Sequence, residues 1–206
     1  MKDFLTKSRR GFTLVELLIV IIILGALSAT MMLSSGDSVV AAKANTIVAN
    51  LSTVKHAALL YWASEPNPTI EDFMQNAKDY LGDTAIENAT TENATLNTLL
   101  DNGKIKSTSW KGGVVMIVGN ISYRVWSQLD GNQENGIWKA QCNFGPEANT
   151  QHGVTGDPDK EAIRNKLTEM TSDAKLLTEG LLPYNALHDK NVNGDKDMYK
   201  VAIRVK

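Results

Sequence analysis

Arg9-Arg10-Gly11-Phe12-Thr13-Leu14-Val15-Glu16 leads directly into an apolar run that ends at Leu33. Counted from Phe12, the segment has 22 residues, and about 20 suffice for a helix to cross the hydrocarbon core of a bilayer. The first eleven residues carry four basic side chains and one acidic one, so we expect them to stay on the cytoplasmic side. The sequence therefore predicts a cytoplasmic N-terminal segment over residues 1–11 and a transmembrane helix over residues 12–33.

Glu16 is the one charged residue between Phe12 and Leu33. Placing a carboxylate at that depth costs about 2.5–3.5 kcal/mol on insertion scales. We therefore expect Glu16 to have a partner of opposite charge.

The Gly11-Phe12 junction, with basic residues before it and Glu16 after it, resembles the class III signal of the type IV pilin family, which includes the pseudopilins of type II secretion. The resemblance implies that a prepilin peptidase cuts between Gly11 and Phe12 on the cytoplasmic side and methylates the new N-terminus. Glu16 then becomes the fifth residue. In that family it aligns an incoming subunit, with its carboxylate near the N-terminal amine of a neighbour.

Two other interpretations of the N-terminus remain open. Small residues over 25–29 allow an ordinary secretory signal to be cut there. A plain membrane anchor is the other, although an anchor needs neither Glu16 nor the Gly-Phe junction.

The helical pattern continues to about Ser64, where Glu65-Pro66-Asn67-Pro68 ends it. Apolar residues recur at alternating steps of four and three and predict one buried face. They are Val40, Ala44, Ile47, Leu51, Val54, Ala58 and Tyr61. Lys43, Asn50 and Lys55 lie off this stripe. We expect residues 34–64 to form the amphipathic half of one long helix that packs under a head domain.

A run of poor helix formers, Ser34-Ser35-Gly36-Asp37-Ser38, follows the apolar segment. Members of the pilin family often have a proline about eight residues after a glycine that Gly25 matches, but Leu33 stands there in this chain. A proline kink is therefore unsupported. Either residues 25–38 stretch on assembly, or the helix is straight with a weak point.

Length and charge fit one globular domain on a long helix. Of 206 residues, 195 remain after the leader, and a whole-chain charge of −2 becomes about −5 once the +3 of residues 1–11 is removed. No basic block follows the leader, which argues against nucleic-acid binding.

Cys142 is the one cysteine, so an intramolecular disulfide is impossible, and we interpret it as a small buried hydrophobic residue.

Residues 65–206 predict a globular α+β head, the pilin-like lollipop arrangement of a long helix packed on a small antiparallel sheet. We expect helices over 69–81, with Thr69 as N-cap, and over 157–179, with Asp157 as N-cap and Pro158 in the first turn. We expect strands over 113–118, 121–127, 137–144 and 197–205, with a hairpin turn at Gly119-Asn120.

The Thr- and Asn-rich segment 83–102 predicts a solvated loop with a short helix over 96–100. Trp110, Trp126 and Trp138 are interpreted as packing residues, with a carbohydrate-binding platform as the alternative.

The segment 189–197 places oxygen-bearing side chains at every second position and Gly194 at the sixth. This matches the opening of a calcium loop, whose candidate ligands are Asp189, Asn191, Asn193, Asp195 and Asp197. The twelfth position is Lys200 and not the usual glutamate, so such a site needs another carboxylate or water. The alternative is an Asn-Gly hairpin turn with solvated charges.

Catalysis has no support in the sequence. His56 lies on the long helix, His152 and His188 have no metal-ligand spacing, and Cys142 has no evident partner base. We therefore expect no enzymatic activity.

The resemblance implies a structural subunit that is held in the bacterial inner membrane by its N-terminal helix before assembly. It then polymerises through that helix into an extracellular or periplasmic filament, with other pilin subunits, the prepilin peptidase/methyltransferase and an inner-membrane assembly platform as partners. The alternatives are a pseudopilin of type II secretion and a membrane-anchored binding protein that does not polymerise.

Overall fold

The computed structural model describes residues 14–87, 89–99, 105–146, 154–178, 181, 183–184 and 199–206. Its helices are α1 (Leu14–Ser64), α2 (Ile70–Gln75), α3 (Ala77–Leu81), the 3-10 turn η1 (Gly82–Thr84), α4 (Lys160–Glu169) and α5 (Thr171–Ala174). Its strands are β1 (Glu92–Leu99), β2 (Ile105–Val118), β3 (Ile121–Asp130), β4 (Gln133–Asn143) and β5 (Lys200–Arg204). The chain divides into two compact units, residues 1–39 and 40–206, and α1 contributes to both.

The long helix α1 ends at Ser64, as the proline-containing segment after it predicts. It is helical through residues 34–38, so the weak helix formers do not interrupt it. Over the part of the chain that the structure describes, no helix is long and apolar enough to cross a membrane. The transmembrane assignment of residues 12–33 is therefore not confirmed and stays a prediction.

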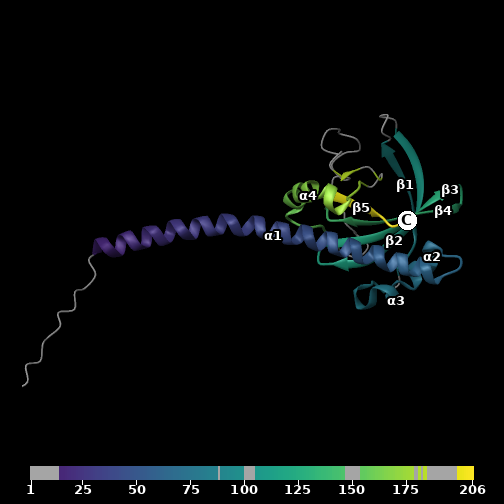
Figure 1. Cartoon of the computed structure of the whole chain (residues 1–206), viewed down its shortest axis with the longest axis horizontal. Coiled ribbons are helices and arrows are strands. Elements are labelled where there is room, and N and C mark those ends of the chain that lie inside the picture. Colours follow the sequence, from purple (N-terminus) through teal and green to yellow (C-terminus); the bar gives the residue numbers. More distant parts are fainter. Residues whose placement is uncertain are drawn as a thin grey trace, which may run out of the picture. The chain divides into compact units, whose positions relative to one another are not determined.

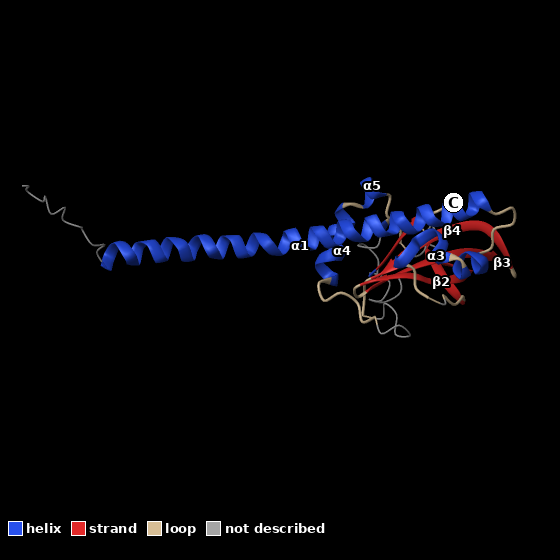
Figure 2. Ribbon diagram, turned by 90° about the horizontal axis from the view of Figure 1, so that it is seen from below, coloured by secondary structure: helices blue, strands red, loops and turns tan. Residues whose placement is uncertain are grey.

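The second unit is built on a five-stranded antiparallel sheet whose strands follow the chain in the order β1-β2-β3-β4-β5 (Figure 1). From Val40 onward α1 lies along one face of this sheet (Figure 2). This confirms the α+β class and the antiparallel sheet that the sequence predicts.

The buried face of α1 is the one that the helical periodicity predicts. Ala44, Ile47, Leu51, Val54, Ala58 and Tyr61 are at most 2% exposed, and Val40 is partly buried. They share one core with the inward side chains of the sheet, which include Tyr123, Val125, Ala140, Cys142 and Val201. The side chain of Asn50 also donates a 3.0 Å hydrogen bond to the Tyr123 hydroxyl. The stripe thus fixes which side of α1 faces the sheet.

The central hairpin, β2–β3, turns at Gly119-Asn120 as expected. Gly119 has φ +57°, a conformation that favours glycine. β2, β3 and β4 are each longer than the predicted strands, because the expected apolar runs are their buried parts and polar ends extend the pairing.

The prediction of a loop with a short helix over residues 83–102 is wrong for β1. Glu92–Leu99 is a strand that pairs antiparallel with β2, in register from Glu92 opposite Gly112 to Leu99 opposite Ile105. Its alternation places Ala94 and Leu96 half-buried and Asn93 and Thr95 exposed. The composition of β1 contains little strand signal. Its pairing with the backbone edge of β2 therefore supplies most of its stability.

The helix expected over 69–81 is divided at Asn76 into α2 and α3. Thr69 caps it as predicted, since its hydroxyl accepts a 3.2 Å hydrogen bond from the Asp72 amide. The helix expected over 157–179 is shorter than predicted. α4 starts at Lys160, a break at Met170 separates it from α5, and the chain leaves the helix at Lys175, whose φ is +52°.

The last strand, β5, pairs with β4 and is the final strand of the sheet. On its other side Leu177 forms a bridge with Ala202 through two backbone hydrogen bonds of 2.7 and 2.8 Å. Leu177, which falls within the helix expected over 157–179, is therefore part of an extended segment.

The tryptophans of the sheet are packing residues, as expected. Trp110, Trp126 and Trp138 are at most 3% exposed. Side chains buried to this degree cannot stack on a sugar in solution, so the alternative of a carbohydrate-binding platform is wrong for these residues.

Cys142 is fully buried under α1, and burial raises the pKa of its thiol. The thiolate is the reactive form, so deprotonation in the folded protein is strongly disfavoured. We expect a thiol reagent at pH 8 to leave Cys142 unmodified in the native protein and to modify it fully in denaturant, as read by mass spectrometry. Rapid stoichiometric labelling of the native protein would contradict this.

Candidate functional site

Over residues 14–24, α1 exposes apolar side chains on every side. The large apolar residues from Leu14 to Leu24 range from 44% exposed at Val20 to 86% at Leu14. They are Leu14, Val15, Leu17, Leu18, Ile19, Val20, Ile21, Ile22, Ile23 and Leu24. We call residues 14–24 the apolar segment.

A helix that is apolar all round is stable when other apolar groups surround it. Burying each leucine or isoleucine side chain of this kind gains roughly 1.5–3 kcal/mol, so the combined tendency of the apolar segment to associate is large. Its β-branched residues also add little intrinsic helix propensity in water. The segment therefore gains free energy when other apolar groups cover it.

Glu16 lies in the first turn of α1 and is exposed. A carboxylate there interacts favourably with the positive end of the helix dipole. Its neighbours in sequence are Val15 and Leu17, which are 63% and 56% exposed. The site is thus a carboxylate at the start of an apolar helix, placed where an associating molecule can reach it.

The cleavage residues that the sequence predicts, Gly11 and Phe12, lie outside the described residues. The structure therefore places Glu16 but does not place the junction that precedes it. The cleavage and methylation assignments stay predictions.

The five candidate calcium ligands, Asp189, Asn191, Asn193, Asp195 and Asp197, also lie outside the described residues. Within the residues that are described, no group of three or more His, Cys, Asp or Glu side chains is arranged to hold a metal ion. The calcium assignment stays a prediction.

A calorimetric titration of the full chain tests the calcium prediction. If the loop is a calcium site, we expect heat of binding at up to millimolar calcium and its loss in the variant Asp189→Asn/Asp195→Asn, because calcium sites depend on carboxylate charge. Absence of binding at millimolar calcium would leave the Asn-Gly turn as the better interpretation.

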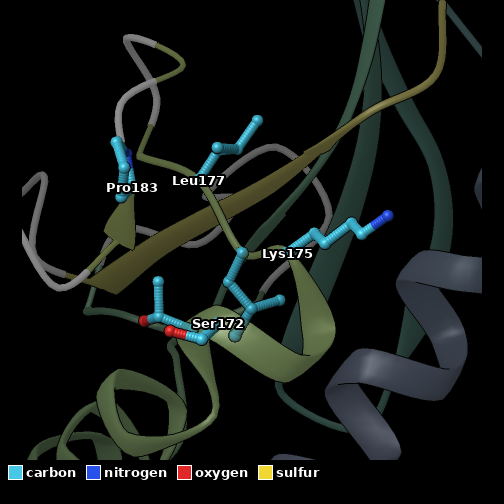
Figure 3. A pocket seen from close by; sticks show the side chains of 6 residues that line it. Ser172, Lys175, Leu177 and Pro183 are labelled. Carbon is cyan, nitrogen blue, oxygen red and sulfur yellow. The ribbon is translucent and has the colours of Figure 1, made fainter.

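Catalytic chemistry finds no constellation in the described part of the chain. His56 is exposed on α1, and Cys142 is buried with a raised pKa. A surface hollow of about 390 Å³ is lined by Thr171, Ser172, Lys175, Leu176, Leu177 and Pro183. Lys175 is its one titratable residue, and its side chain extends away from Ser172 (Figure 3). The described residues that line this hollow therefore offer no acid-base pair.

Sequence reasoning missed the partners of Lys43, which lies off the buried stripe of α1. Its ammonium pairs with the carboxylates of Asp157 and Asp159, each at 2.8 Å. These residues are more than a hundred positions away, and no local pattern links them.

Comparison with known proteins matches residues 6–32 to the family described as the prokaryotic N-terminal methylation motif. This motif is the class III prepilin signal of type IV pilins and pseudopilins, so the resemblance noted in the sequence is confirmed. Neither the curated proteins nor the solved structures gave a match to the chain.

Proposed function

We propose that this chain, whose residues 6–32 carry the class III prepilin signal, is a structural subunit of a type IV pilus-like filament. The observation that supports this most is that the signal contains the apolar segment, in which every large apolar side chain is at least 44% exposed. Families with this motif are structural and not catalytic.

In this proposal a prepilin peptidase cuts after Gly11 and methylates the amine of Phe12. Before assembly the helix over residues 12–33 holds the subunit in the inner membrane, with the leader on the cytoplasmic side. An inner-membrane assembly platform then transfers the subunit into the filament. There, helices of neighbouring subunits cover the apolar segment in place of lipid.

Glu16 gives this assembly its register. Cleavage creates a cationic amine four residues before Glu16, at the depth where the carboxylate needs a partner. An amine from a neighbouring subunit compensates the buried charge when the two helices have one particular offset. Apolar packing then supplies most of the attraction, and the ion pair selects the offset.

The second candidate is a pseudopilin of a type II secretion system, which uses the same signal and the same helix. In that case the filament is periplasmic and is not recovered from the cell surface. The third candidate is a membrane-anchored binding protein that does not polymerise. It predicts that Glu16 is dispensable, because an anchor gains from a fully apolar segment.

Co-expression of the full chain with a prepilin peptidase tests the processing step. We expect the chain to lose its first eleven residues and to begin at methylated Phe12. The control Gly11→Val should stay uncut, because a branched side chain replaces the hydrogen of glycine at the cleaved bond. Removal of the leader at another position, or equal cleavage of both chains, would contradict the proposal.

A further inference from the structure

Lys43 joins α1 to a segment that lies far away in the sequence. Its Nζ is 2.8 Å from Oδ1 of Asp157 and 2.8 Å from Oδ2 of Asp159. Both carboxylates lie just before α4, which begins at Lys160. We call these two ion pairs the Lys43 clamp.

Backbone contacts restrict the positions of the two carboxylates. The Asp157 amide donates a 3.0 Å hydrogen bond to the Phe144 carbonyl, and Oδ1 of Asp157 accepts a 2.9 Å hydrogen bond from the Asp159 amide. Gly156 has φ +85°, and a Cβ there would lie 2.0 Å from the carbonyl oxygen of Gly145. Because these contacts restrict the turn, the clamp loses less conformational entropy than a pair between two mobile side chains.

Loss of the positive charge of Lys43 is unfavourable, because the two carboxylates beside it are only partly screened by water. The Asp157 side chain is 12% exposed and that of Lys43 is 32% exposed, so water screens this pair only partly. The hydrogen bond from Lys43 to Asp157 contributes most, and the one to Asp159 next, to raising the pKa of the Lys43 ammonium above its usual value. Without Lys43 the two carboxylates would repel each other, and Asp157 would be a poorly hydrated charge.

The clamp lies at the start of the part of α1 that belongs to the head. The second unit begins at Val40, and Ala44 is the first fully buried residue of the stripe. Val40 and Ala41 are half-buried and Ala42 is exposed. Apolar burial over residues 40–44 is therefore small, and a polar contact has a large share in holding this turn.

We propose that the Lys43 clamp is a latch that keeps the first turn of the head's part of α1 docked on the turn before α4. A mechanical role for the clamp, in which it resists tension on the head, rests on the proposed function. In a filament, neighbouring subunits would hold the helix before Val40. Tension then reaches the head first at the clamp. Opening of the latch frees residues 40–46 and the turn before α4 together and leaves the sheet intact.

Hydrogen exchange of the full chain in detergent micelles tests the latch in the unassembled protein. In Lys43→Met, which keeps the aliphatic stem, we expect about fivefold faster exchange in peptides over 40–47 and 156–164, the size that losing two partly screened ion pairs implies. Peptides from β3 and β4 should be unchanged. Lys55→Met is the matched control, because Lys55 is also a half-buried lysine on α1, and it should exchange as the wild type does.

A triple variant separates the clamp from a general effect of residue 43. Lys43→Met/Asp157→Asn/Asp159→Asn removes the repulsion as well as the attraction, so it should exchange more slowly than Lys43→Met alone in both regions. Exchange of Lys43→Met at the wild-type rate, a change spread evenly over the head, or a triple variant no slower than the single one would each overturn the latch.

The result is independent of polymerisation, because the measurement uses single subunits. If exchange follows the expected pattern but the co-expression assay shows no processing at Gly11, the clamp docks α1 in the single subunit. Its mechanical role in a filament is then contradicted. If processing occurs but Lys43→Met leaves exchange unchanged, the filament proposal is supported. The docking role of the Lys43 clamp is then contradicted.

Discussion

Replacing Glu16 with leucine is expected to remove this chain from sheared filaments while leaving its amount in the membrane unchanged. The substitution makes the apolar segment more apolar, so membrane retention should be kept or improved. In the filament it leaves the amine of a neighbouring Phe12 without its carboxylate. Breaking a buried ion pair in this way costs about 3–5 kcal/mol, so we expect at least a tenfold fall in the ratio of filament to membrane protein.

Ile21→Leu is the control for the Glu16 experiment, since it changes the shape of one exposed apolar side chain and no charge. It should assemble nearly as the wild type does. Immunoblots of sheared and membrane fractions give the ratio for each variant. Normal assembly of Glu16→Leu would favour the membrane-anchored binding protein that does not polymerise.

Replacing Trp138 with alanine is expected to give the largest loss of stability in the head. Trp138 is fully buried and contacts the rings of Tyr61, Trp62 and Phe73, with centroids 6.2, 5.6 and 5.9 Å away. Its backbone also pairs with Lys206. Truncation of a buried tryptophan costs about 3–5 kcal/mol, so urea unfolding should show a lower midpoint with an unchanged slope.

Trp138→Phe is the matched control. The Nε1 atom of Trp138 is buried without a hydrogen-bond partner, so phenylalanine removes that unsatisfied donor and keeps most of the ring contacts. Its destabilisation should be clearly smaller than that of Trp138→Ala. Equal effects of the two substitutions, or a loss below about 1 kcal/mol for Trp138→Ala, would show that this cluster does not hold α1 on the sheet.

The sequence predicted the elements whose signal is local. The stripe from Ala44 to Tyr61 repeats at helical spacing, and each of its residues is buried where expected. The Gly119-Asn120 turn was predicted because glycine readily adopts positive φ, and the Thr69 cap because a threonine hydroxyl can accept a hydrogen bond from the first turn of a helix. The N-terminal signal is also local, because the types and spacing of Gly11, Phe12 and Glu16 are enough to recognise it.

Features that depend on distant partners were missed. β1 is too polar to be identified alone, and β2 supplies the pairing. α4 starts at Lys160, later than expected, and Asp157 instead forms an ion pair with Lys43 and accepts a hydrogen bond from the Asp159 amide. The sequence placed Lys43 correctly off the buried stripe but contained no information on which carboxylates it meets.

Mass spectrometry of the N-terminal peptide from filaments sheared off intact cells tests the central claim most directly. The account predicts a peptide that begins at N-methylated Phe12, which would show processing and incorporation together. Processed chain confined to the membrane fraction would favour the pseudopilin. A chain that still begins at Met1, or one cut near Ala29, would contradict the account.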